Sequence, residues 1–371
     1  MAFTFTSEQR ALRDAVAAFV AEHSGESTVR AVSETEHGYD PAVWRVLAQQ
    51  LGLVGLIVPE RYGGSGAGPI ELAIVCEELG KALFCGPYLA SAVLATSLLL
   101  DLGDDIINTE LLPALAGGDR TATVAVDEGA GTWDPVTVAT SATQMPNGWT
   151  VSGTKRYVLD GASADILLVV TEGPRVFAVD RAGPGVAVAP LQTLDRTRRQ
   201  ADITFAEAPA RPLDGDAATA LQRTLDTGAV MLAAEQAGGA RRALDMAVDY
   251  AKQRYQFGRA IGSFQAIKHM CADLVVEAES AYSAAYYAAW ALSGETADAD
   301  ATGSADLAAA FCADAFVKVA SDNIQIHGGI GFTWEHPAHL YLRRARTDAQ
   351  LLGDSAHHRD RYLTALAGTA S

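Results

Sequence analysis

The spacing of apolar residues changes twice along the chain, which predicts three structural regions. In the first region Leu12, Val16 and Phe19 recur on one face of a helix, and residues 41–53 and 70–83 repeat this helical pattern. After the first third of the chain the period becomes that of short strands, and the helical period returns in the C-terminal part. We therefore predict helices, then a sheet, then helices again.

The middle of the chain consists of short runs rich in β-branched residues, separated by turn signals such as Pro146-Asn147-Gly148. No segment between these runs is long enough for a helical crossover between parallel strands, so we predict an antiparallel sheet. The predicted strands are Ala122–Val126, Val136–Thr140, Trp149–Ser152, Ile166–Val170, Val176–Val179, Val186–Ala189 and Ile203–Phe205.

Long helices are predicted for the C-terminal part, over residues 230–248, 264–290 and 307–324, with the polar segment Gly294–Ser304 as a solvent loop. The order of elements indicates an α+β protein and excludes a Rossmann fold or a barrel. The predicted parts are an N-terminal helical domain (1–119), a middle antiparallel β-domain (120–214) and a C-terminal helical bundle (215–371).

The chain of 371 residues is acidic, with 28 Lys and Arg against 45 Asp and Glu and a formal net charge of −17. This balance argues against nucleic acid or an anionic membrane as a partner, because both require clustered cations. No signal peptide is recognisable at the N-terminus, and the longest apolar stretch, Leu89–Leu100, is shorter than the ~20 residues of a membrane helix. We expect a cytoplasmic protein without membrane insertion.

Two histidine-containing segments superficially resemble metal sites. The run from Glu335 to His339 lacks the order of a zinc-binding helix, and Pro337 would interrupt such a helix. The pair His357-His358 lies in a charged C-terminal segment, and we expect it to be exposed to solvent. We predict no metal ion.

Two other segments carry more specific chemical information. In the first, a helix is predicted to end near Phe257-Gly258, with Arg254 in its last turn, and a new helix begins near Ser263. An arginine there also suits the helix dipole alone. In the second, three glycines within residues 328–331 follow a helix, which exceeds the needs of a C-cap and indicates close approach of a backbone or a phosphate.

With these segments in view, the whole chain resembles an acyl-CoA dehydrogenase. The resemblance runs from SEQRALRDAVAAF through PERYGGSGAGPIELAIVCEELGK to QRYQFGRAIGSFQAIKH and QIHGGIGFTWEHPAHLYLRRA. It implies the three-part fold of that family, FAD as cofactor, an acyl-CoA thioester as substrate, and an electron-transfer flavoprotein or similar acceptor. The implied reaction is α,β-dehydrogenation, in which a carboxylate removes the α-proton while the flavin takes the β-hydrogen as hydride.

The resemblance also implies which residues bind FAD. In the family, one subunit reaches the ADP half of its neighbour's FAD with an RxxFG segment, a glutamine of the following helix and a QxxGG loop. An arginine fork suits a pyrophosphate, and glycines allow the main chain to approach it. The matching positions are Arg254, Phe257, Gln265, Gln325, Gly328 and Gly329.

The sequence departs from the family at the catalytic base. Counting along the family motifs places Leu352 at the usual position of the base and Gly228 at the second known position. Neither side chain can accept a proton. Asp354 and Glu235 are the carboxylates nearby, both out of register, and they are the candidate bases.

The chain's own flavin-contacting positions depart as well. The resemblance places them at Val126, Asp127, Tyr157 and Leu159. Asp127 stands where the family has a threonine that hydrogen-bonds the flavin, and a carboxylate there disfavours reduced, anionic flavin. Leu159 replaces a second threonine.

An intact half-site for a neighbour's FAD beside an altered site of its own resembles the smaller subunit of bacterial heterotetrameric acyl-CoA dehydrogenases. Those enzymes oxidise bulky, often sterol-derived CoA thioesters, and a larger partner subunit carries the base. Two alternatives remain open: a homo-oligomeric acyl-CoA dehydrogenase with an atypical base, and a catalytically silent subunit kept for assembly.

Overall fold

The computed structural model describes residues 4–129, 131, 133, 137–294 and 301–369. The chain divides into two compact units. We call the first the helical unit and the second the sheet unit. The helical unit comprises Met1–Val29, Pro69–Phe84 and Ala229–Ser371, and the sheet unit comprises Arg30–Gly68 and Cys85–Gly228.

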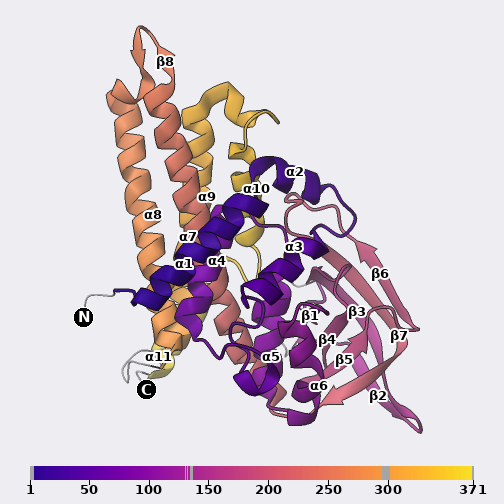
Figure 1. Cartoon of the computed structure of the whole chain (residues 1–371). Coiled ribbons are helices and arrows are strands. Elements are labelled where there is room, and N and C mark those ends of the chain that lie inside the picture. The colour runs from indigo at the N-terminus through magenta and orange to yellow at the C-terminus, as the bar shows by residue number, and fades with distance from the viewer. Residues whose placement is uncertain (1–3, 130, 132, 134–136, 295–300, 370–371) are drawn as a thin grey trace. The chain divides into compact units, whose positions relative to one another are not determined.

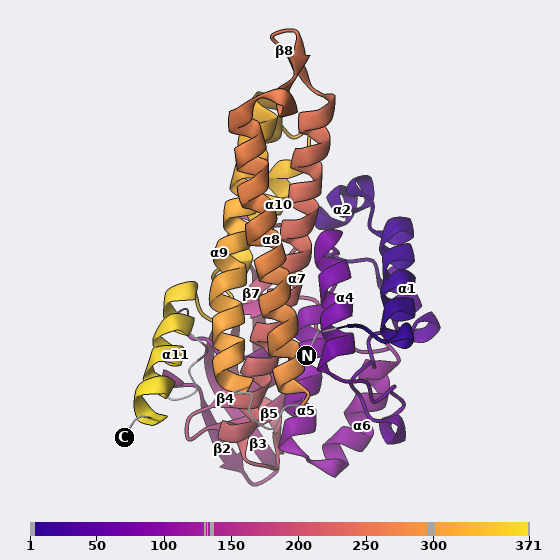
Figure 2. The ribbon, with the colours of Figure 1, turned by 90° about the vertical axis from the view of Figure 1, so that its left-hand side faces the viewer.

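In the helical unit, α7, α8 and α9 run side by side, α1 packs on α4, and α11 packs on α9 (Figures 1 and 2). The predicted long helices are confirmed, although α9 begins earlier than expected and includes the end of the predicted loop 294–304. The helices of this unit are α1 (Ser7–His23), α4 (Pro69–Lys81), α8 (Gln265–Leu292), α9 (Ala301–His327), α10 (Ala338–Asp348), α11 (Ser355–Thr369) and the C-terminal part of α7 (Ala217–Gln253).

Helices α4 and α7 cross in direct backbone contact, and glycine permits this closeness. A Cβ atom on Gly238 would lie 2.0 Å from the Glu77 carbonyl oxygen, and one on Gly80 would lie 2.2 Å from the Glu235 carbonyl oxygen. Because real Cβ atoms do not approach backbone so closely, only glycine fits at these two positions.

A buried polar network joins α1, α4 and α8 near this crossing. The Arg13 guanidinium donates to Glu77 Oε2 and to the Tyr286 hydroxyl, both at 2.8 Å, and that hydroxyl donates to Glu77 Oε2 at 2.6 Å. Lys81 Nζ lies 2.7 Å from Glu77 Oε1. The Glu77 carboxylate is thus fully satisfied, as a buried charge must be.

The connection between α7 and α8 is a β-hairpin rather than the simple turn that the sequence predicts. Helix α7 ends at Gln253, so Arg254 lies just beyond it, and strands β8 (Tyr255–Gln256) and β9 (Arg259–Ala260) pair with each other. Phe257 and Gly258 form the tip with φ angles of +53° and +77°. Two successive positive φ angles are typical of the tight turns that join hairpin strands. The hairpin projects beyond the ends of α7 and α8 (Figure 1).

The sheet unit contains a seven-stranded sheet in the order β1-β4-β5-β7-β3-β2, with β6 also paired to β7. Six of the seven predicted strands form. The sheet is mixed rather than antiparallel, because β1 pairs in parallel with β4. The strands are β1 (Ala122–Ala125), β2 (Ser141–Met145), β3 (Gly148–Leu159), β4 (Ile166–Thr171), β5 (Arg175–Asp180), β6 (Val186–Pro190) and β7 (Gln200–Leu213).

One predicted strand is wrong. Val136 lies outside the described residues, and Thr137–Thr140 form no strand. The amides of Ala139 and Thr140 donate to the Glu128 carboxylate at 2.8 and 2.9 Å, so a side chain takes the hydrogen bonds that a neighbouring strand would accept. The strand begins at Ser141 instead.

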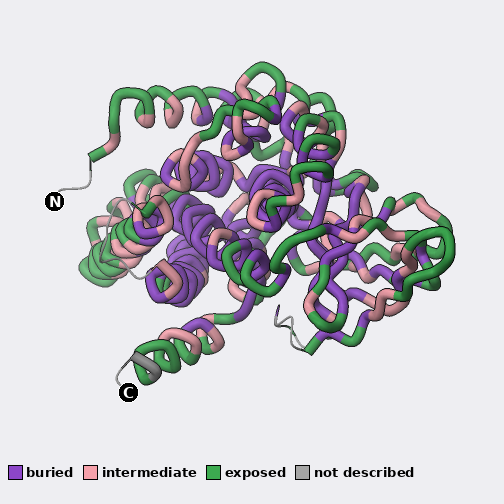
Figure 3. Tube along the Cα trace, turned by 90° about the horizontal axis from the view of Figure 1, so that it is seen from below, coloured by how far each residue is buried: buried purple, intermediate pink, exposed green. Residues whose placement is uncertain are grey.

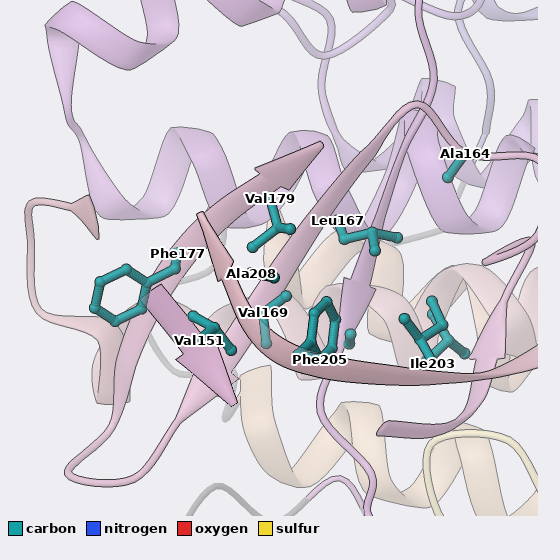
Figure 4. Close-up of a cluster of buried hydrophobic side chains, with 11 residues drawn as sticks. Val151, Ala164, Leu167, Val169, Phe177, Val179, Ile203, Phe205 and Ala208 are labelled. Carbon is teal, nitrogen blue, oxygen red and sulfur yellow. The ribbon is translucent and has the colours of Figure 1, made fainter. Parts of the chain in front are cut away.

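Apolar side chains from one face of the sheet form the core of this unit. Val151, Val169, Phe177, Ile203 and Phe205 are each at most 3% exposed and come together from four strands (Figure 4). In the first half of β7, buried residues alternate with more exposed ones, which is the period of two that strands impose.

Short helices complete the sheet unit, and α2 and α7 are shared by both units. These helices are α2 (Glu26–Ser33), α3 (Pro41–Arg45), which continues as a π-helical turn (Val46–Gln50), α5 (Thr96–Leu102) and α6 (Asp105–Ala116).

Burial differs between the central helices and those near the chain ends. Buried residues lie along the central helices, whereas the helix next to the N-terminus and the helix that leads to the C-terminus carry many exposed residues (Figure 3). Among the described residues, no helix is long and apolar enough to cross a membrane.

Candidate functional site

Aromatic stacking brings the two informative segments of the helical unit together. Tyr250, near the end of α7, stacks on His327 at the end of α9, with ring centroids 4.3 Å apart. His327 also contacts His336 at 4.2 Å, and its Nδ1 lies 2.8 Å from the Asn323 carbonyl oxygen. Burial lowers the pKa of this imidazole, which keeps it neutral at the packing point. The α7–α8 hairpin and the glycine loop after α9 therefore lie at the same end of the unit, which we call the hairpin end.

All six positions assigned to a neighbour's FAD are exposed, and they lie on the segments that meet at the hairpin end. Phe257 at the hairpin tip is 91% exposed, a costly arrangement for a phenyl ring in water. Within the described part of the chain, the Arg254 guanidinium forms no ion pair. The other members, Gln265, Gln325, Gly328 and Gly329, are exposed as well.

The glycine loop presents open backbone. Gly328 has a φ angle of +64°, and a Cβ atom on either Gly328 or Gly329 would meet nothing within 4 Å. The space beside this main chain is therefore available to a ligand. An unpaired guanidinium and bare backbone fit an anionic group such as a pyrophosphate.

In the sheet unit, Asp127 is turned into its own loop. It is 4% exposed, and its Oδ1 accepts from the amides of Gly129 and Gly131 at 2.7 and 3.3 Å. Its carbonyl oxygen accepts the Arg156 amide at 2.8 Å. The carboxylate thus occupies two glycine amides that a small ligand could otherwise use.

The remaining own-flavin positions also offer little polar chemistry. Leu159 is 1% exposed, and its carbonyl oxygen accepts the Thr123 hydroxyl at 2.6 Å. Val126 is buried, and its carbonyl oxygen accepts Lys155 Nζ at 2.9 Å. Tyr157 is 46% exposed with a φ angle of +53°. Leu159 thus has no hydroxyl at the position where the family has a threonine, and Val126 offers none either.

A buried ion pair that sequence reasoning missed supports these loops. Lys155, with no exposed surface, lies 2.7 Å from Glu128 Oε1. Burial lowers the pKa of Lys155. Burial alone would raise the pKa of Glu128, but hydrogen bonds from Lys155, Thr140 and two backbone amides lower it to about 2. The only signal in the sequence is a lysine in the middle of a strand.

Neither expected base position holds a proton acceptor. Leu352 is 4% exposed with a φ angle of +61°, and Gly228 lies within α7. Asp354 is exposed, and its Oδ1 accepts the His357 amide at 2.8 Å, which caps the start of α11. Glu235 is buried and forms an ion pair with Arg344. Both candidate carboxylates thus have structural roles.

The expected exposure of the pair His357-His358 is wrong for His358. That residue is 3% exposed, and its Nδ1 lies 2.8 Å from Asp306 Oδ1. Arg361 Nε is 3.5 Å from the same oxygen, so two side chains of α11 contact the buried Asp306 carboxylate of α9. Adjacent residues of a helix point in different directions, so His358 is buried while His357 stays partly exposed.

Comparison with known proteins identifies the family. A model described as the acyl-CoA dehydrogenase N-terminal domain matches residues 6–119, and one described as the C-terminal domain matches residues 217–366. The acyl-CoA dehydrogenase IpdE2 of Mycolicibacterium smegmatis is 37% identical over 348 residues, which cover 94% of this chain and 95% of IpdE2. The chain belongs to the acyl-CoA dehydrogenase family.

Solved acyl-CoA dehydrogenase structures agree with this assignment. The Tcur3481–Tcur3483 steroid ACAD is 31% identical, with a TM-score of 0.88 over 98% of this chain and 99% of that one. The ChsE4–ChsE5 complex from Mycobacterium tuberculosis is 29% identical, with a TM-score of 0.89 over 99% of both chains. The acyl-CoA dehydrogenases are FAD-dependent oxidoreductases, so the family fold and its cofactor apply to this chain.

Proposed function

We propose that this chain is the subunit without a catalytic base in a heteromeric acyl-CoA dehydrogenase. One observation carries the proposal: at the two positions that the family uses for the base, Leu352 and Gly228 cannot accept a proton. The carboxylates nearby are both engaged, since Asp354 caps α11 and Glu235 pairs with Arg344. A buried carboxylate held by a guanidinium is a poor base, because the ion pair stabilises its charged form.

The hairpin end then has the role of completing a partner's FAD site. Arg254 supplies a planar fork for the pyrophosphate, Phe257 supplies a ring surface, and Gly328 and Gly329 let the main chain approach. When bound, FAD supplies the hydride acceptor for dehydrogenation. The contribution of this chain is to bind and orient the ADP half of the cofactor.

The altered loops of the sheet unit support an uneven division of labour between subunits. Asp127 uses its carboxylate to hold Gly129 and Gly131 and leaves a negative charge where the family binds flavin. That charge disfavours reduced flavin in the chain's own site. If half of the active sites in the heteromer bind neither flavin nor substrate, the space they leave can accommodate a bulky substrate at the remaining sites.

We further propose a steroid-derived acyl-CoA thioester as the substrate and an electron-transfer flavoprotein or similar protein as the acceptor. The support for the substrate class is similarity to the Tcur3481–Tcur3483 steroid ACAD. The support for a heteromer is similarity to the ChsE4–ChsE5 complex, which contains two different chains.

The flavin content of the purified chain tests the proposal. The chain is purified alone and with a larger acyl-CoA dehydrogenase of the same organism that has glutamate at the base position, and bound flavin is read from the visible absorption spectrum. We expect little flavin in the chain alone and a flavin-loaded, active enzyme after co-expression. A full complement of flavin in the chain alone, bleached by acyl-CoA, would contradict the proposal and favour the homo-oligomer.

Two variants sharpen this test. Asp354→Asn in this chain is expected to leave turnover of the complex unchanged, whereas replacing the glutamate base of the partner by glutamine is expected to abolish it. If Asp354→Asn abolishes turnover, this chain supplies the base. If no partner chain gives turnover, the protein is a silent assembly subunit.

A further inference from the structure

The helical unit contains a cavity that the proposed reaction does not use. It has a volume of about 410 Å³ and lies between the ends of α1 and α4, the start of α2, the middle of α7 and the start of α10. This volume falls within the range of small-molecule sites, roughly 300–1,000 Å³. The cavity shares no residue with the positions assigned to FAD or to the base.

The lining of the cavity is mainly apolar. Val20, Val29, Leu83, Met246 and Leu340 contribute to it, and each is at most 9% exposed. Apolar side chains that are buried around an open space favour an apolar ligand, because the ligand removes their remaining surface from water.

The wall is held in place by hydrogen bonds to the turn after α4. Ser24 Oγ donates to the Ala82 carbonyl oxygen at 3.2 Å, and the Tyr341 hydroxyl donates to the Lys81 carbonyl oxygen at 2.7 Å. These two bonds tie the end of α1 and the start of α10 to the same turn. The cavity is therefore preformed, which lowers the entropic cost of binding.

Leu83 in this turn has a strained backbone. Its φ angle is +49°, in the left-handed region where glycine is usual. Its side chain is 2% exposed and faces the cavity. Strained residues of this kind persist where the surroundings require the side chain, and they gather at ligand sites.

One cation at the cavity remains available to a ligand. Lys81 Nζ is already bonded to Glu77 and Glu78, each at 2.7 Å. Arg242 lines the cavity, is exposed, and within the described ranges forms no ion pair. Burial raises the pKa of the Tyr341 hydroxyl, and the charge of Arg242 and a hydrogen bond from its side chain oppose that rise. The Arg242 guanidinium can therefore bind a planar anion through two parallel hydrogen bonds.

We propose that this cavity binds an amphiphilic carboxylate, with its hydrocarbon chain among the apolar residues and its carboxylate on Arg242. A carboxylate suits the site better than a phosphate ester, because Glu26 and Glu78 also line the cavity and repel a second negative charge. The site is separate from the reaction centre, so the proposal holds whether or not this chain is the base-lacking subunit.

Isothermal titration of the full-length protein with dodecanoate tests the proposal, with 1-dodecanol as the probe that lacks the charge. We expect one site per chain that binds dodecanoate at least tenfold more tightly than dodecanol, since a hydrogen-bonded charge pair is worth about a factor of ten or more. Absence of dodecanoate binding, or equal affinity for the two probes, overturns the proposal.

Three variants locate the site. Arg242→Gln is expected to weaken dodecanoate binding about tenfold and to leave dodecanol binding unchanged, and Met246→Trp is expected to abolish both by filling the cavity. Arg241→Gln is the matched control, because the neighbouring arginine pairs with Glu279 at 2.6 Å and does not line the cavity. It should bind like the wild type. Binding that is equal in the wild type, Arg242→Gln and Met246→Trp places dodecanoate elsewhere and overturns the proposal.

Discussion

The carboxylate of Glu235 on α7 is paired with the guanidinium of Arg344 on α10, and the two side chains are only 11% and 3% exposed. The pair lies where α7 crosses α4, since a Cβ atom on Gly80 would meet the Glu235 backbone. Sequence reasoning treated Glu235 as a candidate base because it is a carboxylate near a known base position. In the structure, this carboxylate neutralises a buried arginine.

Removing one member of this pair should destabilise the protein strongly. We expect Glu235→Gln to cost about 3–5 kcal/mol, because it removes the carboxylate that pairs with the buried Arg344 guanidinium. The measurement is the shift of the thermal unfolding midpoint. Glu279→Gln is the matched control, since Glu279 pairs with Arg241 at an exposed site, and surface pairs are worth about 0–1 kcal/mol. Equal unfolding midpoints for both variants would show that the buried pair stabilises the protein no more than the exposed pair does.

The α4–α7 crossing makes a second prediction about stability. Gly238→Ala places a methyl group 2.0 Å from the Glu77 carbonyl oxygen, so the helices must move apart. We expect a loss of about 1–3 kcal/mol or more, the usual cost of overpacking. Gly25→Ala is the control, because a Cβ atom there meets nothing within 4 Å and Gly25 has no positive φ angle. Urea unfolding should separate the two variants, and similar midpoints for both would be against this account.

The sequence predicts most helices well because their signal is local. The predicted 264–290 helix corresponds to α8 at Gln265–Leu292, since apolar spacing alone marks the buried face. Strand pairing is not local. The parallel pairing of β1 with β4 joins residues about forty positions apart, and no pattern within either strand indicates its direction.

The site shows the same limit. Family motifs indicate Arg254 and Gly328, but the ion pair of Lys155 with Glu128 joins residues 27 positions apart. Charged residues are exposed by default, so a single sequence predicts solvent contact for such groups. His358 is an example: its burial depends on Asp306, which lies 52 positions earlier on another helix. Only the fold brings these partners together.

The Lys155–Glu128 pair predicts how stability depends on acid. The pKa of Glu128 falls from its ordinary value of 4.5 to about 2 in the folded protein. A lowered pKa means that the folded state binds this proton less readily than the unfolded state. The stabilisation, about 3 kcal/mol, is therefore present above pH 4.5 and is lost as the pH falls towards 2.

The variant Glu128→Gln isolates this contribution. At pH 7 it should unfold at a lower temperature than the wild type, because Lys155 is left buried without its counter-charge. As the pH falls from 4.5 towards 2, the difference in unfolding temperature between the two proteins should shrink. Glu36→Gln serves as the control, since Glu36 is exposed on the surface of the sheet unit. A difference that stays constant over this pH range would contradict the assignment.

A substitution of Arg254 should affect cofactor binding but not the stability of the chain. The Arg254 guanidinium is exposed and forms no ion pair within the described residues. Arg254→Gln should therefore change the free energy of unfolding of the chain alone by about 0.5 kcal/mol or less, as ordinary surface substitutions do.

In the complex with a larger subunit, the same variant should bind FAD about 10–100-fold more weakly, because a charge-assisted contact to the pyrophosphate is lost. Flavin retained after dialysis gives the measurement, and Arg241→Gln, on the same helix but away from the hairpin end, should retain flavin like the wild type. If the Arg254→Gln complex also retains its flavin fully, the hairpin end of this chain does not bind the cofactor. The loops around Asp127 in the sheet unit would then be the remaining candidate for a flavin contact in this chain.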